Sequence, residues 1–432
     1  MRVNLKYGRA GLAVDLPETP GFLGVLTPAE APPLEDPQAE LQKILAAPIA
    51  SAPLAQLARG KQNACIVVSD ITRPVPNRVL LPPLLQILEE SGVARENITL
   101  LVATGIHRPN EGIELEQLVG KEIAGRYRVV NHFSKRIETM TYVGTIGDRV
   151  PVYVNRLYYE ADLKILTGFI EPHMWAGYSG GRKSILPGIS SIETLQYLHG
   201  PEMIAHPLTT YGVLEGNPFH EAGLAIMAKA GADFIVNVTL NPAKAITGIF
   251  AGDPVQAHLQ GCAFLAKHCL CELAEPLDFI LTTNAGAPLD CNLYQSVKGM
   301  TAAAKALKPG GVVVIATSCS EGVGSPEYQE ILDLVDTPAH FLERLARREF
   351  FIPDQWCAQE TYQVMLRNPV WVYSGGIAPD QLEKYHFKAL SSLAAALDQL
   401  FDKLGPDAQW AVVPDGPMII LQTKPMSFPT QL

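Results

Sequence analysis

The chain has 432 residues, of which 47% are hydrophobic and 18% are charged, and its formal net charge is −10. This length is too great for one ordinary core and predicts two domains, while the composition excludes an intrinsically disordered chain. The acidic balance excludes a general attraction for nucleic acid or for an anionic membrane, so an anionic ligand would need a local cluster of Arg and Lys.

The N-terminal sequence MRVNLKYGRAGLAVDLP has no continuous apolar stretch of the kind found in signal peptides. No run approaches the roughly 20 apolar residues of a membrane span. The seven cysteines form an odd and scattered set, which is typical of reduced thiols. These features predict a cytoplasmic protein that binds neither nucleic acid nor membrane.

Strand and helix patterns alternate through the first half of the chain. Short strands are expected around Gly8 and Gly11, and residues 27–37 are typical of a surface connection. Buried strands are predicted at residues 64–68, 98–103, 163–167 and 234–238, and helices at 78–91 and 253–273. Such alternation predicts an α/β fold with a mainly parallel sheet covered by helices.

The alternation restarts after the long helix that ends near residue 273. Strands are predicted at 278–283, 312–317 and 370–373, a helix at 293–307, and late strands at 410–413 and 418–422 that return to the first domain. The expected domains are therefore 1–272, completed by 408–432, and 276–405. Parallel sheets bind ligands at the carboxyl ends of their strands. The loops that carry reactive side chains all follow predicted strands, at residues 69–77, 104–110, 168–184 and 284–298.

The first two of these loops carry a carboxylate, a guanidinium and an imidazole. In Ser69-Asp70-Ile71-Thr72-Arg73-Pro74, Asp70 can hold a ribose hydroxyl or orient Arg73, which suits bidentate recognition of a carboxylate or phosphate. A capped turn before the next helix is the alternative. In ATGIHRP, His107 follows a glycine at a strand exit, where an imidazole can exchange protons at neutral pH, although a lone loop histidine is more often a surface residue.

A glycine-rich segment around Lys183 is the strongest single signal. It reads GFIEPHMWAGYSGGRKSILPG and combines His173 with an Arg-Lys pair. Glycines allow close backbone approach, and successive N–H groups can form a nest for a phosphate. Read from Gly177, the segment resembles the phosphate-binding loop G-x-x-x-x-G-K-[ST], but Arg182 stands at the second glycine. A nucleotide-binding protein or kinase that uses Lys183 on phosphates is therefore kept as an alternative.

Two further segments hold candidate ligands. In Leu198-His199-Gly200, with His206 seven residues on, one imidazole can serve as a single ligand to nickel or zinc. Farther along, Gln295 and Lys298 are three residues apart near a predicted helix start, where both can hold an anion. An ordinary exposed helix start is the alternative for this last segment.

Taken together, these segments resemble the nickel-dependent lactate racemase family over nearly the whole chain. The resemblance rests on SDITRP, ATGIHRP, EPHMWAGYSGGRKSILPGI, LHGPEMI and LYQSVKG, in that order. It implies two α/β domains with the active site in the cleft between them. It also implies racemisation or epimerisation of a 2-hydroxy acid by proton-coupled hydride transfer to a nickel pincer nucleotide, a pyridinium-3,5-bisthiocarboxylate mononucleotide.

The resemblance also assigns roles. Lys183 would carry the cofactor covalently, and His199 would be the protein ligand to nickel. Residues 70–73, namely Asp70, Ile71, Thr72 and Arg73, would bind the nucleotide, and His107 and His173 would be the two acid/base residues. Arg73, Tyr294, Gln295 and Lys298 would bind the substrate. The implied partners are a small 2-hydroxy acid and the proteins that make and insert the cofactor.

Residue chemistry supports this reading independently. Removal of the C2 hydrogen of a 2-hydroxy acid as hydride is easier when a base takes the hydroxyl proton. Racemisation needs such a base on each face of C2, which two histidines can provide. A two-lobed periplasmic-type binding protein is a third reading, but it would need an export signal. The identity of the 2-hydroxy acid and the oligomeric state stay open at this point.

Overall fold

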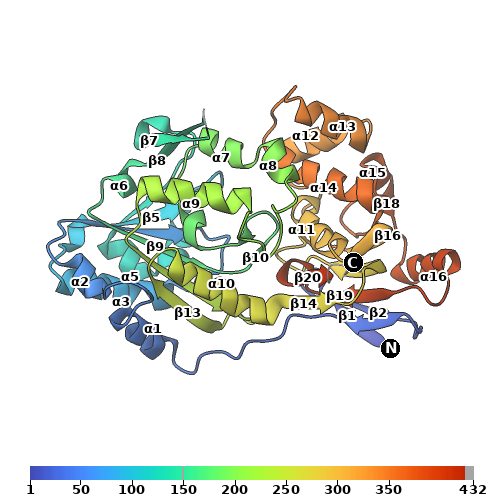
Figure 1. The fold of residues 1–432 in the computed structure, drawn as a ribbon, viewed down its shortest axis with the longest axis horizontal. Helices are drawn as coiled ribbons and strands as arrows, with labels where there is room; N and C mark the ends of the chain where they lie inside the picture. Colours follow the sequence, from blue (N-terminus) through green and yellow to red (C-terminus); the bar gives the residue numbers. More distant parts are fainter. Residues whose placement is uncertain (148–149, 424–432) are drawn as a thin grey trace, which may run out of the picture. The chain divides into compact units, whose positions relative to one another are not determined.

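The structure is a computed structural model that describes residues 1–147 and 150–423. Its contacts divide the chain into two compact units (Figure 1). The first unit comprises residues 30–203 and 208–268, and the second comprises residues 1–29, 204–207 and the chain from 269 onward. Each unit is built around a six-stranded sheet, as the α/β alternation predicts.

The sheet of the first unit is parallel except at one edge. Its order is β13 (Ile246–Gly252), β12 (Phe234–Leu240), β9 (Leu163–Phe169), β4 (Ala64–Ser69), β5 (Ile98–Ala103) and β6 (Arg128–Asn131). Only β12 and β13 pair antiparallel among these strands. Ala64 of β4 lies opposite Ile98 of β5 and Leu163 of β9, so the carboxyl ends of these three strands share one edge.

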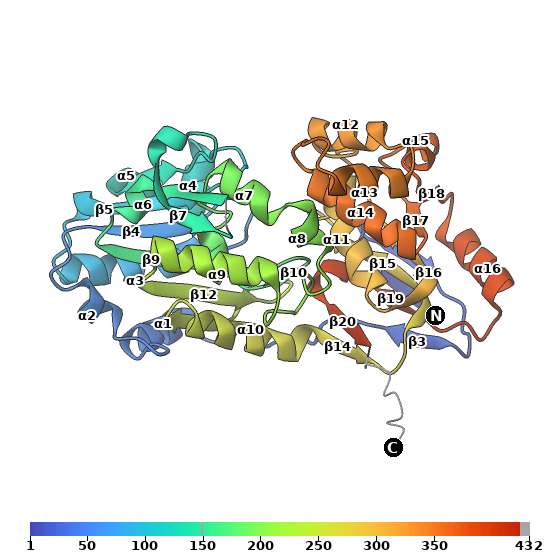
Figure 2. The ribbon, with the colours of Figure 1, turned by 45° about the horizontal axis from the view of Figure 1, so that its top comes forward.

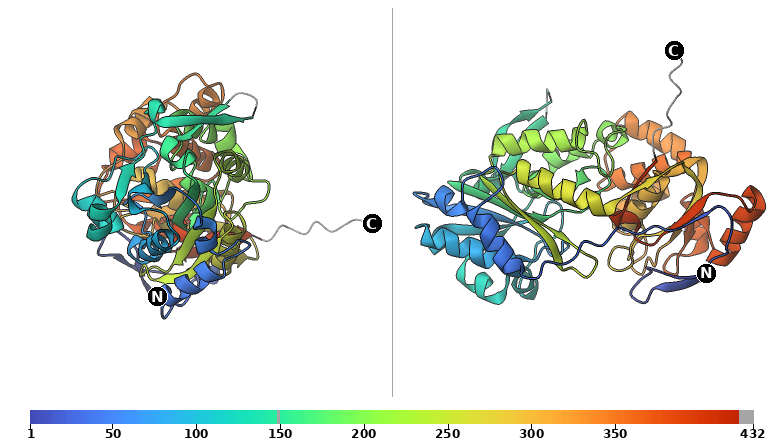
Figure 3. Two further views of the ribbon diagram at one scale, coloured as in Figure 1. Left: turned by 90° about the vertical axis from the view of Figure 1, so that its left-hand side faces the viewer. Right: turned by 60° about the horizontal axis from the view of Figure 1, so that its bottom comes forward.

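Helices and two hairpins surround this sheet. They are α1 (Pro37–Ala46), α2 (Leu54–Ala58), α3 (Asn77–Glu90), α4 (Ile113–Val119), α5 (Lys121–Arg126), α6 (Arg156–Tyr159), α7 (Ile192–Leu198), α8 (Pro201–Ala205), α9 (Pro218–Ala230), α10 (Gln256–Cys269), and the pairs β7 (Met140–Ile146) with β8 (Val150–Asn155) and β10 (Pro172–His173) with β11 (Gly177–Tyr178). Helices α1 to α3 (blue) lie side by side in Figure 3, and α9 and α10 flank β9 and β12 in Figure 2.

Both faces of the central strands are buried, which explains their continuous apolar sequences. Ile66 and Val68 of β4 belong to one core with Leu41 of α1 and Leu84 of α3. Val67 points to the opposite face, and it is buried as well. A strand covered on both sides reads as an unbroken apolar run instead of an alternating one.

The sheet of the second unit is parallel throughout. Its order is β18 (Lys388–Ala389), β17 (Val370–Tyr373), β16 (Leu307–Ala316), β15 (Leu277–Thr283), β19 (Trp410–Val413) and β3 (Phe22–Val25). The other elements are β1 (Arg2–Leu5) with β2 (Leu12–Asp15), β14 (Leu270–Leu273) with β20 (Ile420–Thr423), α11 (Leu293–Ala304), α12 (Pro326–Leu334), α13 (Pro338–Ala346), α14 (Gln355–Arg367), α15 (Pro379–Lys384) and α16 (Leu393–Leu404).

The ends of the chain are placed differently from the predicted boundaries, which gave residues 1–272 and 408–432 to the first domain. Residues 410–413 pair with β15, and residues 22–25 pair with 410–413, so both segments belong to the second sheet. Trp410 stacks on Phe279 of β15 with ring centroids 5.1 Å apart, which fixes this strand in the second core. The long helix predicted over 253–273 ends at Cys269 as α10, and strand β14 follows it.

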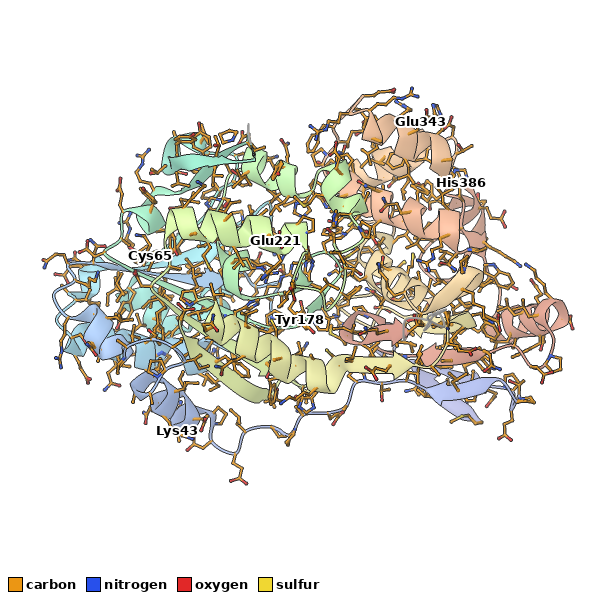
Figure 4. All side chains as sticks on the ribbon, in the orientation of Figure 1. Lys43, Cys65, Tyr178, Glu221, Glu343 and His386 are labelled. Atoms are coloured by element: carbon orange, nitrogen blue, oxygen red, sulfur yellow. The ribbon has the colours of Figure 1, made fainter. Side chains whose placement is uncertain are left out.

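Within the part of the chain that the structure describes, no helix is both long and apolar enough to cross a bilayer. All seven cysteines are free thiols, and Cys65 of β4 is labelled in Figure 4.

Candidate active site

The loop after β4 holds its carboxylate rigidly inside the protein. Asp70 is 3% exposed, and its Oδ1 accepts hydrogen bonds from the Thr72 amide at 3.0 Å and the Thr72 hydroxyl at 2.5 Å. The Arg73 amide donates to the Asp70 carbonyl at 3.1 Å, and the Ile71 amide donates to Oδ1 of Asn110 at 3.1 Å. The loop is thus a closed turn that fixes Asp70 and leaves the Thr72 and Arg73 side chains outside the core.

The second oxygen of Asp70 meets the imidazole of the loop after β5. Oδ2 of Asp70 lies 2.6 Å from Nδ1 of His107, whose side chain is 45% exposed. Burial raises the pKa of Asp70, but the hydrogen bonds from His107 and Thr72 and the charge of Arg73 outweigh it, so this pKa lies below its ordinary value. The carboxylate is therefore ionised at neutral pH and orients the exposed ring of His107.

A short hairpin after β9 holds the other predicted acid/base residue. His173 of β10 pairs with Gly177 of β11. Nδ1 of His173 accepts the backbone N–H groups of Trp175 and Ala176, both at 3.2 Å. The tight turn between the strands brings these amides back onto the imidazole, so the hairpin itself sets the orientation of the ring.

Aromatic rings surround the predicted nickel ligand. His199 follows α7, is 8% exposed, and packs edge-on against Trp175 and Phe219, with ring centroids 5.3 Å away in each case. Its Nδ1 lies 3.0 Å from the Leu195 carbonyl and donates to it, because a carbonyl oxygen only accepts. Nε2 is then the lone-pair nitrogen of the neutral ring, which is the nitrogen that ligates a metal.

Burial is the main cause that lowers the pKa of His199 to about 4, and the nearby Lys183 ammonium lowers it further. The ring is consequently neutral at physiological pH, as metal ligation requires. His206, the other candidate of this segment, is exposed.

Lys183 lies next to the same aromatic rings. Its Nζ is 5.3 Å from the centroid of the Phe219 ring, a cation–π distance, and its electrostatic effect reaches His199. The ring of Phe219 also lies 6.4 Å from that of His173. Lys183, His173 and His199 therefore converge on Phe219, the second residue of α9.

The glycines and the arginine of this segment serve packing. Gly180 and Gly181 have positive φ angles of 76° and 56°, and an added Cβ would lie 2.6 Å from the Asn237 side chain or 2.7 Å from the His258 ring. Arg182 is 1% exposed and donates to the carbonyls of Ala176 and Tyr178. Tyr178, which is labelled in Figure 4, is itself buried.

The phosphate-binding alternative does not match this geometry. The Gly181 amide donates to Asn237 and the Lys183 amide to the Gly180 carbonyl, so both are already bonded within the protein. The Ser184 hydroxyl donates to the Thr167 carbonyl. Residues 181–184 form a single short 3₁₀ turn in place of the long helix that follows a phosphate-binding loop.

The residues predicted to bind substrate lie at the start of α11 in the second unit. The Asn292 side chain caps this helix by accepting the Gln295 amide at 2.9 Å. Nζ of Lys298 donates to Oε1 of Gln295 at 2.7 Å, so the predicted shared face is confirmed. Tyr294 packs edge-on against Tyr328 and accepts from the Trp356 indole at 3.3 Å; burial raises its pKa, and it stays a neutral phenol.

The structure thus joins the predicted residues in three groups: Asp70 with His107; His173, Lys183 and His199; and Tyr294, Gln295 and Lys298. Sequence reasoning missed Trp175, Phe219 and Asn217, which frame the second group. The sequence Asn217-Pro218 was a usable signal, because Asn followed by Pro is typical of a helix N-terminus. Among the described residues there is no group of three or more His, Cys, Asp or Glu side chains arranged around a metal.

The first unit places two imidazoles, an amine and a guanidinium-bearing loop at the carboxyl ends of adjacent parallel strands. The fold and these side chains are typical of an α/β enzyme with groups suited to proton transfer. Comparisons with known proteins identify its family. Residues 7–212 match the lactate racemase N-terminal domain and residues 273–421 match the lactate racemase C-terminal domain. The chain belongs to the lactate racemase family, and it is an enzyme of the isomerase class.

Similar proteins cover almost the whole chain. The lactate racemase of Thermoanaerobacterium thermosaccharolyticum is 35% identical over 426 residues, 98% of this chain and 99% of that protein. The lactate racemase of Lactiplantibacillus plantarum is 38% identical over 387 residues, 89% and 91% of the two chains. The solved apoprotein of the Thermoanaerobacterium enzyme superposes with a TM-score of 0.92 at 34% identity, covering 98% and 100%. A Thermotoga maritima protein shares the fold, with a TM-score of 0.66 at 18% identity, covering 90% and 100%.

Proposed function

We propose that this enzyme interconverts the enantiomers of lactate or a closely related 2-hydroxy acid, using a nickel pincer nucleotide attached to Lys183. The observation that carries the proposal is the convergence of Lys183, His173 and the neutral, buried His199 on one aromatic ring. Membership of the lactate racemase family supports the substrate class.

The residues present fit such a cofactor. The Lys183 amine could condense with a thiocarboxylate to give a thioamide, with loss of water, and the Nε2 lone pair of His199 suits nickel. His199 would be the one protein ligand to nickel, and Lys183 would hold the rest of the group covalently. The chemistry that the group supplies when bound is reversible acceptance of a hydride from C2 of the substrate. We propose that the turn at residues 70–73 contacts the nucleotide portion.

The protein's own groups would bind the substrate anion and move its hydroxyl proton. Arg73 in the first unit and Lys298 in the second are cations in an acidic chain, and both suit a carboxylate. Gln295 shares the helix face of Lys298, and Tyr294 stands beside it. We propose that Arg73, Tyr294, Gln295 and Lys298 bind the substrate.

His107 and His173 would serve the two faces of the substrate carbon. The hydroxyl of each enantiomer points to a different side of a fixed carboxylate, so one imidazole cannot reach both positions without moving several ångströms. One histidine takes the hydroxyl proton when one enantiomer reacts, and the other histidine takes it when the opposite enantiomer reacts. Loss of either is expected to abolish racemisation.

The proposed activity also has consequences for partner proteins and for the location of the enzyme in the cell. A cofactor of this kind requires proteins that make and insert it, and we propose that the enzyme receives it from them. We further propose a cytoplasmic location, since all seven cysteines are free thiols.

Intact mass spectrometry tests the covalent assignment. The wild-type protein, co-produced with the cofactor-making enzymes, should carry an adduct and racemise at least one compound in a chiral screen of 2-hydroxy acids. The Lys183→Ala protein should show neither the adduct nor the activity, because it lacks the amine. An adduct on the Lys183→Ala protein would move the anchor to another residue, and tight ATP binding by the unloaded protein would favour the kinase alternative.

A further inference from the structure

We propose that Asp70 is a positioning residue that fixes His107 as the proton acceptor of the resting enzyme, while two backbone amides hold His173 with its proton on the opposite nitrogen. The two imidazoles then rest in different tautomers. This inference rests on the proposed function for its kinetic consequences, but the tautomers themselves are properties of the protein without cofactor.

The contact with Asp70 determines the tautomer of His107. An ionised carboxylate only accepts hydrogen bonds, so the proton of this 2.6 Å contact belongs to Nδ1 of His107. The neutral ring then has its lone pair on Nε2. Asp70 cannot turn away, because it is buried and its other oxygen is held by the Thr72 amide and hydroxyl. The pair has the arrangement in which an aspartate sets the tautomer of a histidine base.

The opposite holds for His173. Its Nδ1 receives two backbone N–H groups, from Trp175 and Ala176, and a backbone amide can only donate. Nδ1 is consequently unprotonated, and the proton of the neutral ring is on Nε2. The hairpin pairing of His173 with Gly177 keeps these amides in place.

With these two tautomers, the resting enzyme is ready to deprotonate one enantiomer of the substrate but not the other. For the enantiomer whose hydroxyl meets His107, the O–H bond breaks and a proton joins Nε2, giving an imidazolium paired with Asp70. The oxygen's electron pair becomes the second bond of the C2 carbonyl, and the C2 hydrogen leaves with its two electrons to the hydride acceptor of the proposed function. For the other enantiomer, His173 must first lose a proton from Nε2 and gain one at Nδ1 from water, breaking two amide contacts.

The tautomer change of His173 can affect kcat, but it cannot make kcat/KM differ between the two enantiomers. Enantiomers have equal free energy, so kcat/KM must be the same in both directions of a racemase. The turnover number is free to differ, and we expect a higher kcat for the enantiomer that meets His107.

Ring-nitrogen NMR of the full chain labelled with 15N-histidine tests the proposal without cofactor. We expect a protonated Nδ1 for His107 and a protonated Nε2 for His173, with the signals assigned by His107→Gln and His173→Gln. In Asp70→Asn, the amide can donate to Nδ1, which moves His107 toward the tautomer with a proton on Nε2. Because the base is then blocked, kcat of the loaded enzyme should fall by about 10²- to 10⁴-fold.

The chain supplies a matched control at the start of α13. Nδ1 of His340 lies 2.6 Å from Oδ2 of Asp336, which is the same contact between two exposed residues outside the proposed site. Asp336→Asn should leave kcat unchanged.

Identical tautomers for His107 and His173 in the wild-type protein would overturn the proposal, and so would wild-type kcat in Asp70→Asn or equal kcat for the two enantiomers. Distinct tautomers in a loaded protein that racemises no 2-hydroxy acid would instead remove the proposed function and leave the tautomer assignment standing.

Discussion

At the scale of single residues, His199 after α7 and His206 after α8 differ in their surroundings. His199 is buried between two aromatic rings with its Nδ1 held by a carbonyl, whereas His206 is exposed. His199→Ala should therefore lower the nickel content of the loaded enzyme severely, and His206→Ala should retain it. Metal analysis after gel filtration measures both. An equal loss in the two variants would contradict the assignment of His199 as the single protein ligand.

The partners of several side chains could be identified only from the folded structure. Asp70 had two readings in the sequence, as a ribose ligand or as a partner of Arg73, and the structure adds a third partner, His107. That contact joins loops 37 residues apart in the chain, and no local pattern reports it. Arg182 looked like half of a basic pair, yet its guanidinium is buried on backbone carbonyls.

At the scale of elements, Asn217 joins the start of α9 to the hairpin loop. Its Oδ1 accepts the amides of Phe219 and His220, and its Nδ2 donates to the carbonyls of Trp175 and Val213. Phe219, around which the proposed site is arranged, is the next residue but one. The cap therefore orients both the aromatic ring and the loop that carries His173.

Asn217→Ala should lower the free energy of unfolding by about 2–4 kcal/mol, because it removes a cap and leaves two carbonyls without this donor. Urea denaturation measures the change. Ser392→Ala is the control, since Ser392 caps α16 through one bond to the Ala395 amide; its expected loss is about 0.5–2 kcal/mol. Equal losses in the two variants would mean that the bonds to the loop contribute nothing.

At the scale of the whole molecule, buried neutral histidines make stability depend on pH. Burial is the first cause that lowers the pKa of four histidines: to about 4 for His132 and His199, and to about 3 for His220 and His258. Unfolding restores a value near 6.5, so the unfolded chain binds more protons below that pH. The contribution of these histidines to the free energy of unfolding is therefore fully present above about pH 7. It falls as the pH drops from about 6.5 toward 4.

Urea denaturation at several pH values between 7.5 and 5 checks this expectation, with His132→Gln as the comparison. His132 is buried, with Nε2 3.0 Å from the Ser190 carbonyl and Nδ1 3.1 Å from the Asn155 side-chain nitrogen. Its removal should reduce the pH slope of the unfolding free energy by up to about 1.4 kcal/mol per pH unit, the value of one proton. Parallel slopes for the two proteins would show that His132 does not take up a proton on unfolding.

The sequence by itself determined the α/β class, most of the strands and the loops that carry the chemistry. Strand positions such as 98–103 and 370–373 were predictable because a strand buried on both faces has a nearly continuous apolar sequence. The pairing of Gln295 with Lys298 was predictable because helical spacing is local.

Only the tertiary structure decided where the chain ends belong and which side chains meet. The sequences of residues 22–25 and 410–413 do not predict which strands they pair with. An apolar strand can pair with many others, and the packing of the whole core selects one. The grouping of Lys183, His173 and His199 around Phe219, and of His107 with Asp70, has the same origin. Strand order brings distant loops to one sheet edge, and the proximity of their side chains follows from that order and from no pattern within a single segment.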